Sequence, residues 1–236
     1  MSKAILDDES ARFFEAASPQ VLCIKGKWGV GKTFAWKKIV SARAASDLSM
    51  PSYAYVSLFG INSLTGLKFS IFEQTMSRSA IGEGPSTSTL QVQFDKLKNL
   101  GRKISGFAGG ALGLLAGTDA SEMLSQSTFF MVRDQIVCID DLERKGRDLE
   151  LRDVLGLVSF LKEERKCKVV LLLNDEKLEG LDQNDFNKNL EKVVDTTVHF
   201  APTTAEACSI AFERPDALQT DISQAATTLA SQTFAF

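Results

Sequence analysis

The sequence is poor in the residues that build metal centres and disulfide frameworks. Among 236 residues there is one histidine, His199, and four cysteines, none of them in a C-x-x-C pair. A single histidine in a strand-like segment is too little for a metal centre, and widely spaced cysteines in apolar runs behave as small hydrophobic residues. We therefore expect Cys23, Cys138, Cys167 and Cys208 to be reduced and mostly buried.

Long apolar runs and a strong excess of one charge are also missing. The net charge of -3 gives the chain no global attraction to nucleic acid. Asp7, Asp8 and Glu9 come too early for the apolar core of a signal peptide. A Gly/Ala/Leu-rich stretch at 104–117 is shorter than the roughly 20 residues that span a bilayer. We expect a cytoplasmic protein in which this stretch packs on a partner, on a membrane surface as a peripheral contact, or on the domain's own core.

One segment carries a specific chemistry. Residues 26–33 read G-K-W-G-V-G-K-T and match the phosphate-binding pattern G-x-x-x-x-G-K-[ST] at every fixed position. Glycines let backbone N–H groups converge on a phosphate, Lys32 reaches the β- and γ-phosphates, and the Thr33 hydroxyl completes a Mg²⁺ shell. The segment predicts binding of ATP with Mg²⁺. The expected nucleotide contacts are Gly26, Trp28, Gly29, Val30, Gly31, Lys32, Thr33 and Phe34.

The surroundings of this segment fit a strand–loop–helix unit. Residues 21–24 are a short apolar strand, and residues 34–40 follow as a helix. Further strand patterns alternate with helical ones; they lie at 53–59, 136–139, 169–173 and 197–200. This alternation predicts an α/β fold, a three-layer P-loop NTPase with a central, mainly parallel five-stranded sheet. The ligand then belongs at the carboxyl ends of the strands.

The domain boundaries follow from the same patterns. Residues 1–201 are predicted to form the ATPase core, with an insertion at about 78–134. Thr203 and Glu206 have the spacing of a helix capping box. Residues 202–236 are therefore predicted to begin a truncated helical lid or linker. Because most of a lid is missing, we expect the chain to be a fragment of a longer protein.

Two carboxylates follow the strand at 136–139. Asp140 is predicted to hold Mg²⁺, and Asp141 is predicted to orient the attacking water. Glu143 is a further candidate for assisting that water. The alternative is a solvated acidic turn before a helix. Asp141 is shorter than the glutamate usual in fast ATPases, so we expect slow hydrolysis.

Two more polar residues complete the candidate site. Asn174 follows an apolar strand that should lie between the loop strand and the Asp140 strand, so we expect it to face the γ-phosphate. A strand-ending turn is the alternative. Arg144 is either a surface cation at a helix start or a charge aimed at a phosphate in its own or a neighbouring subunit. Arg147 and Arg152 are weaker candidates for that contact.

The two motifs together resemble the KAP family of P-loop ATPases. The segments W-G-V-G-K-T at 28–33 and I-D-D-L-E-R at 139–144 correspond to the family's W-G-x-G-K-[ST] and I-D-D-L-D-R type motifs, and the likeness covers about residues 15–212. It implies an additional-strand ATPase core related to the AAA+ and STAND groups, use of ATP and Mg²⁺, and often membrane association or bacteriophage defence. Glu143 replaces the usual aspartate. The transmembrane helices that the family often inserts between the motifs have no counterpart beyond 104–117.

Three functions are compatible with the sequence. The first is an ATP-driven switch or motor that forms a homo-oligomer and signals to an unknown effector. The second is a nucleotide-gated scaffold with little turnover. The third is a nucleic-acid-dependent ATPase, although its basic residues are better explained as solvated helix ends. Those basic residues are Lys96, Lys98, Arg102 and Lys103, or Lys162, Arg165, Lys166 and Lys168.

Overall fold

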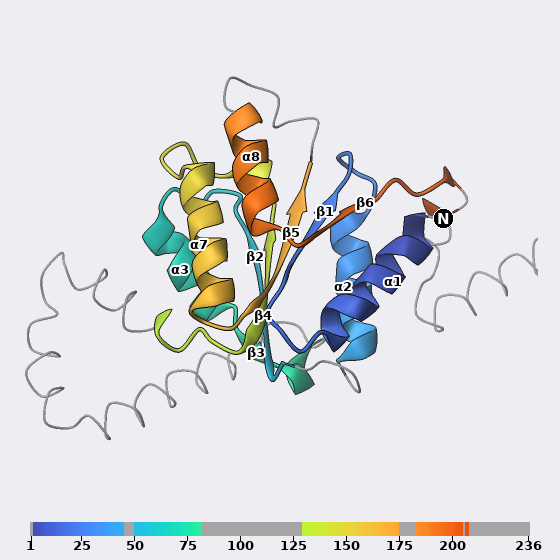
Figure 1. The fold of residues 1–236 in the computed structure, drawn as a ribbon, viewed down its shortest axis with the longest axis horizontal. Coiled ribbons are helices and arrows are strands. Elements are labelled where there is room, and N and C mark those ends of the chain that lie inside the picture. Colours follow the sequence, from blue (N-terminus) through green and yellow to red (C-terminus); the bar gives the residue numbers. More distant parts are fainter. Residues whose placement is uncertain (1, 45–49, 82–128, 175–182, 205, 208–236) are drawn as a thin grey trace, which may run out of the picture.

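A mainly parallel sheet organises the computed structural model, which describes residues 2–44, 50–81, 129–174, 183–204 and 206–207. The strand order is β3-β2-β4-β5-β1-β6, and β3 alone runs antiparallel to its neighbour (Figure 1). The strands are β1 (Val21–Lys25), β2 (Ser52–Ser57), β3 (Met76–Ser77), β4 (Gln135–Asp140), β5 (Lys168–Leu173) and β6 (Thr196–His199).

The predicted α/β class and parallel sheet are confirmed, but the sheet has six strands rather than five. The additional strand is β3, two residues that pair with β2 at the edge of the sheet. A segment this short leaves no alternating apolar pattern in the sequence, and so periodicity could not reveal it.

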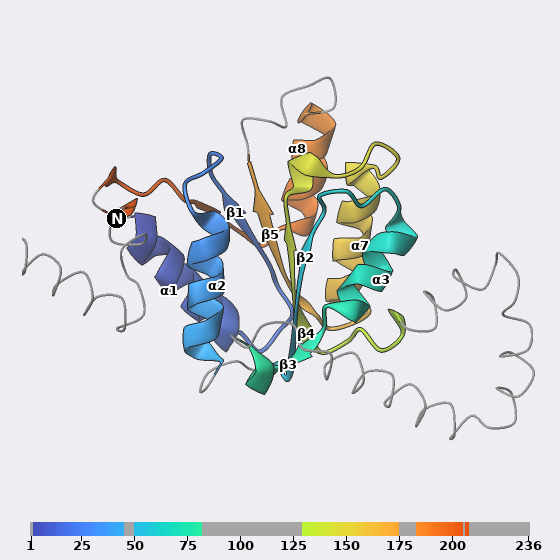
Figure 2. The same ribbon diagram turned by 180° about the vertical axis from the view of Figure 1, so that it is seen from behind.

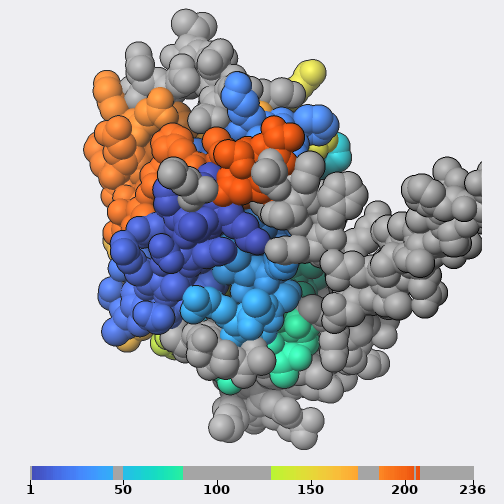
Figure 3. Space-filling view, turned by 90° about the vertical axis from the view of Figure 1, so that its right-hand side faces the viewer, coloured from blue at the N-terminus to red at the C-terminus, as the bar shows by residue number. Residues whose placement is uncertain are grey.

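Helices cover both faces of the sheet (Figures 1 and 2). Helices α1 and α2 lie side by side on one face, as the space-filling view in Figure 3 also shows, and α3, α7 and α8 cover the other. The helices are α1 (Ser2–Glu15), α2 (Lys32–Arg43), α3 (Leu64–Glu73), α7 (Leu151–Glu163) and α8 (Gln183–Val193), with 3-10 turns η1 (Arg78–Ala80) and η2 (Leu142–Arg144).

The two central strands are buried on both faces. All six residues of β4 and all six of β5 are buried, which explains why the sequence shows continuous apolar runs there rather than alternation. Leu171 faces the core under α3, α7 and α8, whereas Leu172 faces the core under α1 and α2. In the second core, Trp36 of α2 stacks on Phe14 of α1 with ring centroids 5.6 Å apart. Each helix layer thus has its own apolar core against one sheet.

The strand order decides where the polar strand ends meet. Strand β5 lies between β4 and β1, as the sequence analysis expected, and all three are parallel. The residues that follow them therefore emerge at one edge of the sheet. Those residues are Asp140–Asp141, Asn174 and the glycine-rich loop that begins at Gly26.

Several sequence predictions can be checked in this fold, and others lie outside the described residues. Cys23, Cys138 and Cys167 are reduced and buried as predicted, and burial raises the pKa of Cys167 to about 11. Cys208, the 104–117 stretch and the basic residues between 96 and 103 lie outside the described ranges. Within those ranges, no helix combines the length and the apolar character needed to cross a membrane.

Lys168 corrects one prediction. It was grouped with cations that either contact nucleic acid or end a helix in solvent, yet it is the first residue of β5 and is fully buried. Its Nζ donates hydrogen bonds of 2.8 Å to the carbonyl oxygens of Phe13 and Phe14, in the last turn of α1. Carbonyls in that turn have no partner within their own helix and carry the negative end of its dipole. The lysine therefore joins α1 to the sheet and is unavailable to an external ligand.

We expect Lys168→Met to lower the free energy of unfolding by about 2 kcal/mol. The substitution keeps an apolar chain of similar length but removes both hydrogen bonds to carbonyls at a buried helix end. Urea denaturation of the parent and the variant measures the difference. Lys192→Met, at an exposed position of α8, is the control and should change stability by less than about 0.5 kcal/mol. Equal stability of the two variants would contradict this role for Lys168.

Candidate nucleotide-binding site

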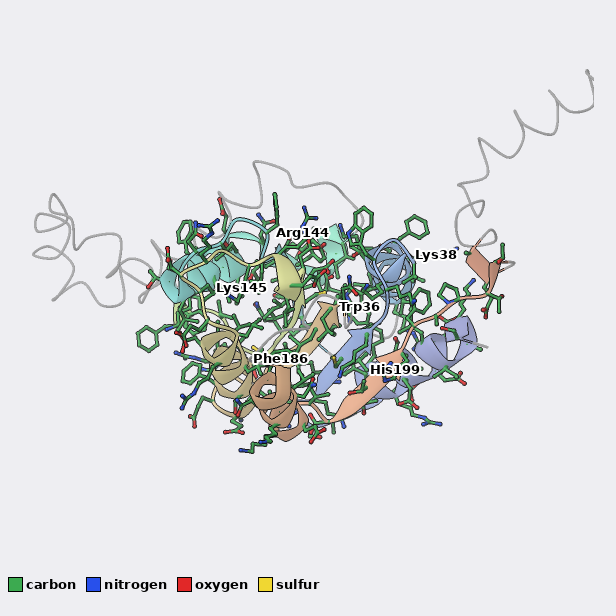
Figure 4. All side chains as sticks on the ribbon, turned by 90° about the horizontal axis from the view of Figure 1, so that it is seen from above. Trp36, Lys38, Arg144, Lys145, Phe186 and His199 are labelled. Atoms are coloured by element: carbon green, nitrogen blue, oxygen red, sulfur yellow. The ribbon has the colours of Figure 1, made fainter. Side chains whose placement is uncertain are left out.

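The candidate site lies at the carboxyl edge of β1, β4 and β5. Figure 4 looks down on this edge and shows Arg144 across the sheet from His199, with Trp36 between them. The glycine-rich loop connects β1 to α2 and presents the first turn of that helix to the site. This arrangement is the one expected for a phosphate-binding loop, because helix N-terminal N–H groups and loop N–H groups then converge.

The backbone of the loop needs its glycines. Gly29 and Gly31 have φ angles of 81° and 89°, in the left-handed region that side chains with a Cβ rarely adopt. Gly31 is also the residue that precedes α2, and its carbonyl accepts the first helical hydrogen bond, 2.9 Å from the N–H of Ala35. Gly26 is constrained differently, because a Cβ there would collide with the carbonyl oxygen of Phe200.

The remaining loop positions divide between core and solvent. Val30 packs against the core under α1 and α2. Trp28 and Phe34 face solvent, with 71% and 50% of their surface exposed. Two large exposed aromatic residues at the mouth of a site are unusual, and such groups are typical of surfaces that contact a ligand or another protein.

Lys32 lies over the loop itself. Its Nζ donates to the carbonyl oxygens of Gly26, at 2.6 Å, and Lys27, at 2.9 Å. These bonds hold the ammonium group at the loop, where a phosphate cradled by the loop would also lie. A phosphate oxygen is the stronger acceptor because it is charged, so the position suits Lys32 for binding a phosphate.

Asp140 is the most enclosed carboxylate of the site, with 4% of its surface exposed. Its Oδ2 accepts hydrogen bonds from the Thr33 hydroxyl, at 2.6 Å, and from the Tyr55 hydroxyl, at 2.8 Å. Its Oδ1 accepts the N–H of Asp141 at 2.7 Å. The structure thus brings Thr33 and Asp140, two residues 107 positions apart in the sequence, into direct contact.

Strand β2 supplies two site residues that the sequence analysis missed. Tyr55 binds Asp140, and the hydroxyl of Ser57 donates to Oδ2 of Asp141 at 2.7 Å. These residues are two apart, on the same face of the strand. The parallel pairing of β2 with β4 sets Ser57 opposite Asp140. The alternation of Tyr53, Tyr55 and Ser57 was the available signal, but polar residues on a strand face point equally often to solvent.

The two hydroxyls have different surroundings. Burial, followed by the nearby charge of Asp140, raises the pKa of Tyr55 well above its ordinary value. Tyr55 therefore keeps its proton and remains a hydrogen-bond donor. Ser57 is partly exposed at the end of the strand, and its hydroxyl also accepts the N–H of Phe59 at 3.2 Å.

Asp141 adopts a left-handed backbone conformation, with φ of 56°, where the chain turns from β4 into η2. Ser57 holds its side chain on one side. On the other, Nη1 of Arg144 lies 4.0 Å from Oδ1. Both oxygens of the Asp141 carboxylate therefore lie near protein groups, Ser57 and Arg144.

Glu143 and Asn174 lie together. The backbone N–H of Asn174 donates to Oε2 of Glu143 at 3.3 Å, and Asn174 is buried, with 1% of its surface exposed. The two residues are 31 positions apart in the sequence, which predicted a different role for each. They meet because β4 and β5 are neighbours in the sheet. Glu143 thus joins η2 to the residue that follows β5.

Arg144 is half exposed, and its guanidinium carbon lies 4.2 Å from the centroid of the Phe59 ring. The contact with Asp141 is a long surface ion pair, worth at most about 1 kcal/mol. Arg147 and Arg152, the weaker candidates for phosphate contact, line a groove of about 700 Å³ between α7 and α8. Lys145, Lys188 and Lys192 line the same groove, beside Phe186 (Figure 4).

The residues of the site fit a magnesium ion. Asp140 is a buried carboxylate, and no lysine or arginine of the described ranges lies within ion-pair distance of it. Neutral hydroxyl and amide donors offset only part of the cost of burying its charge. Since the Thr33 hydroxyl donates its proton to Asp140, its oxygen lone pairs remain free to act as a ligand. Hydroxyl and carboxylate oxygens are the ligands that Mg²⁺ prefers, together with nucleotide phosphates.

Two solved structures align with the chain at low similarity. The crystal structure of Cdc6p from Pyrobaculum aerophilum aligns at 16% identity with a TM-score of 0.46, over 87% of this chain and 45% of that one. The structure of Drosophila ORC bound to DNA aligns at 14% identity with a TM-score of 0.45, over 90% of this chain and 45% of that one. The chain therefore spans less than half the length of either protein. A comparison with curated proteins gave no significant match.

The sequence itself gives a family assignment. The KAP family P-loop domain matches residues 4–219, which includes the glycine-rich loop, Asp140–Asp141 and all six strands. The match covers most of the chain. The chain belongs to the KAP family of P-loop NTPase domains.

Proposed function

We propose that this domain binds ATP with Mg²⁺ and hydrolyses it slowly, as a switch whose nucleotide state controls assembly and an effector. The observation that carries the proposal is the 2.6 Å hydrogen bond between Thr33 and Asp140. It joins the end of the phosphate-binding loop to the carboxylate of a neighbouring strand. A triphosphate and a divalent ion need these two groups at one point, since the metal bridges phosphate oxygens to the protein.

The loop provides the phosphate-binding half of the proposed site. The N–H groups of the loop and of the first turn of α2 favour an anion through their partial positive charge. Lys32 exchanges the carbonyls of Gly26 and Lys27 for phosphate oxygens. The Mg²⁺ ion, held by Thr33 and Asp140, would neutralise phosphate charge.

The carboxylate half supports slow turnover. Asp141 is the candidate for orienting the attacking water, but in this state Ser57 and Arg144 engage its side chain. Hydrolysis then requires Asp141 to leave the hydroxyl of Ser57 or to share it with a water. Asn174, buried at the tip of β5, and Glu143, bound to its backbone, are proposed to respond to the γ-phosphate.

The hydrogen bond between Ser57 and Asp141 also favours a second candidate function, a nucleotide-gated scaffold with little turnover. If Ser57 holds Asp141 in all nucleotide states, ATP binding changes the conformation without hydrolysis. Turnover of the parent with Mg²⁺ separates the two functions, because a scaffold would bind ATP and release no phosphate above the uncatalysed rate. A role in bacteriophage defence, with contact at a membrane surface or with an unidentified effector, is part of the proposal on the strength of the family alone.

We expect Lys32→Ala to weaken ATP binding by about a hundredfold or more while leaving the fold intact. The substitution removes a charge-assisted contact to phosphate, and Lys32 is only partly buried. Titration with a fluorescent ATP analogue measures affinity, and circular dichroism checks the fold. Lys38→Ala is the matched control on the exposed side of the same helix (Figure 4) and should bind as the parent does. Equal affinity of Lys32→Ala and the parent would rule out the proposed site.

We expect substitutions of Asp140 and Asp141 to have different effects on ATP binding and turnover. Asp140→Ala should remove the magnesium dependence of ATP binding, because it deletes a proposed ligand. Asp141→Asn keeps an acceptor for Ser57 and should bind ATP normally but lose phosphate release by about a hundredfold, as a group that orients water would. Nucleotide titrations with and without EDTA, and a phosphate-release assay, distinguish these outcomes. If Asp141→Asn turns over at the parental rate, Glu143 becomes the better candidate.

We expect ATP to shift the full-length protein toward a larger species through Arg144. A nucleotide bound between two subunits stabilises their assembly by mass action, and Arg144 and the exposed Phe59 ring lie at the rim of the site. Arg144→Ala should remove the shift with little loss of ATP binding. Sedimentation with and without ATP measures the mass. Arg133→Ala, at an exposed position just before β4 and so at the opposite edge of the sheet, is the control that should keep the shift. A parent of constant mass would exclude assembly by nucleotide.

A further inference from the structure

Asp140 has a hydroxyl partner that neither motif contains. Tyr55 lies on β2, two residues before the end of that strand, and its hydroxyl donates to Oδ2 of Asp140 at 2.8 Å. The same oxygen accepts the Thr33 hydroxyl at 2.6 Å. One carboxylate oxygen is therefore fixed by donors from two elements, α2 and β2.

The tyrosine ring is itself held by α2. The Nζ of Lys37 lies 4.1 Å from the centroid of the Tyr55 ring, at the distance of a cation–π contact. Lys37 is four residues after Thr33, one helical turn along the same face of α2. Consecutive turns of the helix therefore contact Asp140, through Thr33, and its tyrosine partner, through Lys37. Helix α2 therefore contacts both members of the Tyr55–Asp140 hydrogen bond.

The contact also compensates for burial. Asp140 is nearly inaccessible, and it makes no ion pair with a described lysine or arginine. Among the described residues, its three hydrogen-bond donors are hydroxyl and amide groups, and the two that come from side chains are Thr33 and Tyr55. Groups that hydrogen-bond a metal-binding carboxylate fix its orientation, and removing one typically costs tenfold to a hundredfold in metal affinity.

We infer that Tyr55 is a positioning residue for magnesium: its hydroxyl orients Asp140 toward Thr33 and thereby sets the Mg²⁺ affinity of the nucleotide site. The inference rests on the proposed function, since it assigns to Tyr55 a part in the same site. It concerns a residue outside both motifs, on a strand that contributes nothing to the phosphate loop. Tyr55 does not touch the phosphates or the ion in this role, and it acts through Asp140.

The test is the magnesium dependence of nucleotide binding in Tyr55→Phe. The ring and its contact with Lys37 remain, and only the hydroxyl is removed. We expect the Mg²⁺ concentration for half-maximal enhancement of binding of a fluorescent ATP analogue to rise about tenfold. Binding in EDTA should equal that of the parent. The turnover number at saturating Mg²⁺ should change by less than about threefold, because Asp141 and its contact with Ser57 are untouched.

Tyr53→Phe is the matched control. Tyr53 is two residues earlier, on the same face of β2, and its hydroxyl accepts the indole N–H of Trp36 at 3.1 Å in the core. Its removal also deletes one hydroxyl from the strand and disturbs packing at least as much, but it should leave the Mg²⁺ dependence unchanged. A tenfold shift confined to Tyr55→Phe supports the inference, and an equal shift in both variants would assign the effect to general destabilisation and overturn it.

The outcome also separates this inference from the proposed function. If the parent binds ATP with Mg²⁺ but Tyr55→Phe has the parental Mg²⁺ dependence, the role of Tyr55 is wrong and the nucleotide site stands. If the parent shows no Mg²⁺-dependent binding of ATP at all, both are wrong.

Discussion

The hydrogen bond from Thr33 to Asp140 is the interaction on which the rest of the site depends. It can form only because β5 separates β1 from β4 by a single strand and all three are parallel. The helix after β1 then starts beside the carboxyl end of β4. The apolar residues of β4 and β5 stabilise this order, since both strands are buried on both faces. A polar site of a few hydroxyls and carboxylates is thus positioned by hydrophobic packing that lies below it.

Strand β2 gives the second constraint. One face of the strand carries three polar side chains in succession, and each contacts a different group: Tyr53 contacts Trp36 of the phosphate-loop helix, Tyr55 contacts Asp140, and Ser57 contacts Asp141. The opposite face contributes Ala54 and Val56 to the core under α3 and α7. A strand with alternating faces can therefore serve the core and the site at once. Two residues of this strand that are two positions apart, Tyr55 and Ser57, thus each donate a hydrogen bond to one of the two carboxylates.

Cations in this fold are arranged by backbone carbonyls as much as by acidic side chains. Lys32 lies on the carbonyls of its own loop, and Lys168 lies on those at the end of α1. The first is partly buried beside a phosphate-binding loop, and a stronger acceptor can replace its partners. The second is fully enclosed and serves the fold. The residue type is the same in the two cases, and the difference in burial separates the lysine enclosed by the fold from the one that stays accessible at the loop.

The glycine-rich loop and the acidic strand end could be predicted because each is formed by a short, continuous segment of the sequence. The positive φ angles of Gly29 and Gly31 and the approach of Phe200 to Gly26 are the physical reasons for the spacing that the pattern records. The capping box is equally local, and Thr203 and Glu206 make its reciprocal hydrogen bonds, at 2.8 Å and 3.3 Å. The edge strand β3 could not be predicted, because two residues carry no periodicity.

By itself, therefore, the sequence determined the glycine-rich loop pattern, the α/β class and the position of two carboxylates at the end of a buried strand. Each of these depends on residues that are neighbours in the chain or on a strand–helix alternation that sterics restrict to few topologies. Only the tertiary structure decided that Tyr55 and Ser57 belong to the site, that Glu143 pairs with the end of β5, and that Lys168 is buried. Those facts depend on which strands become neighbours and in what register, and a parallel sheet sets this by packing between segments a hundred residues apart.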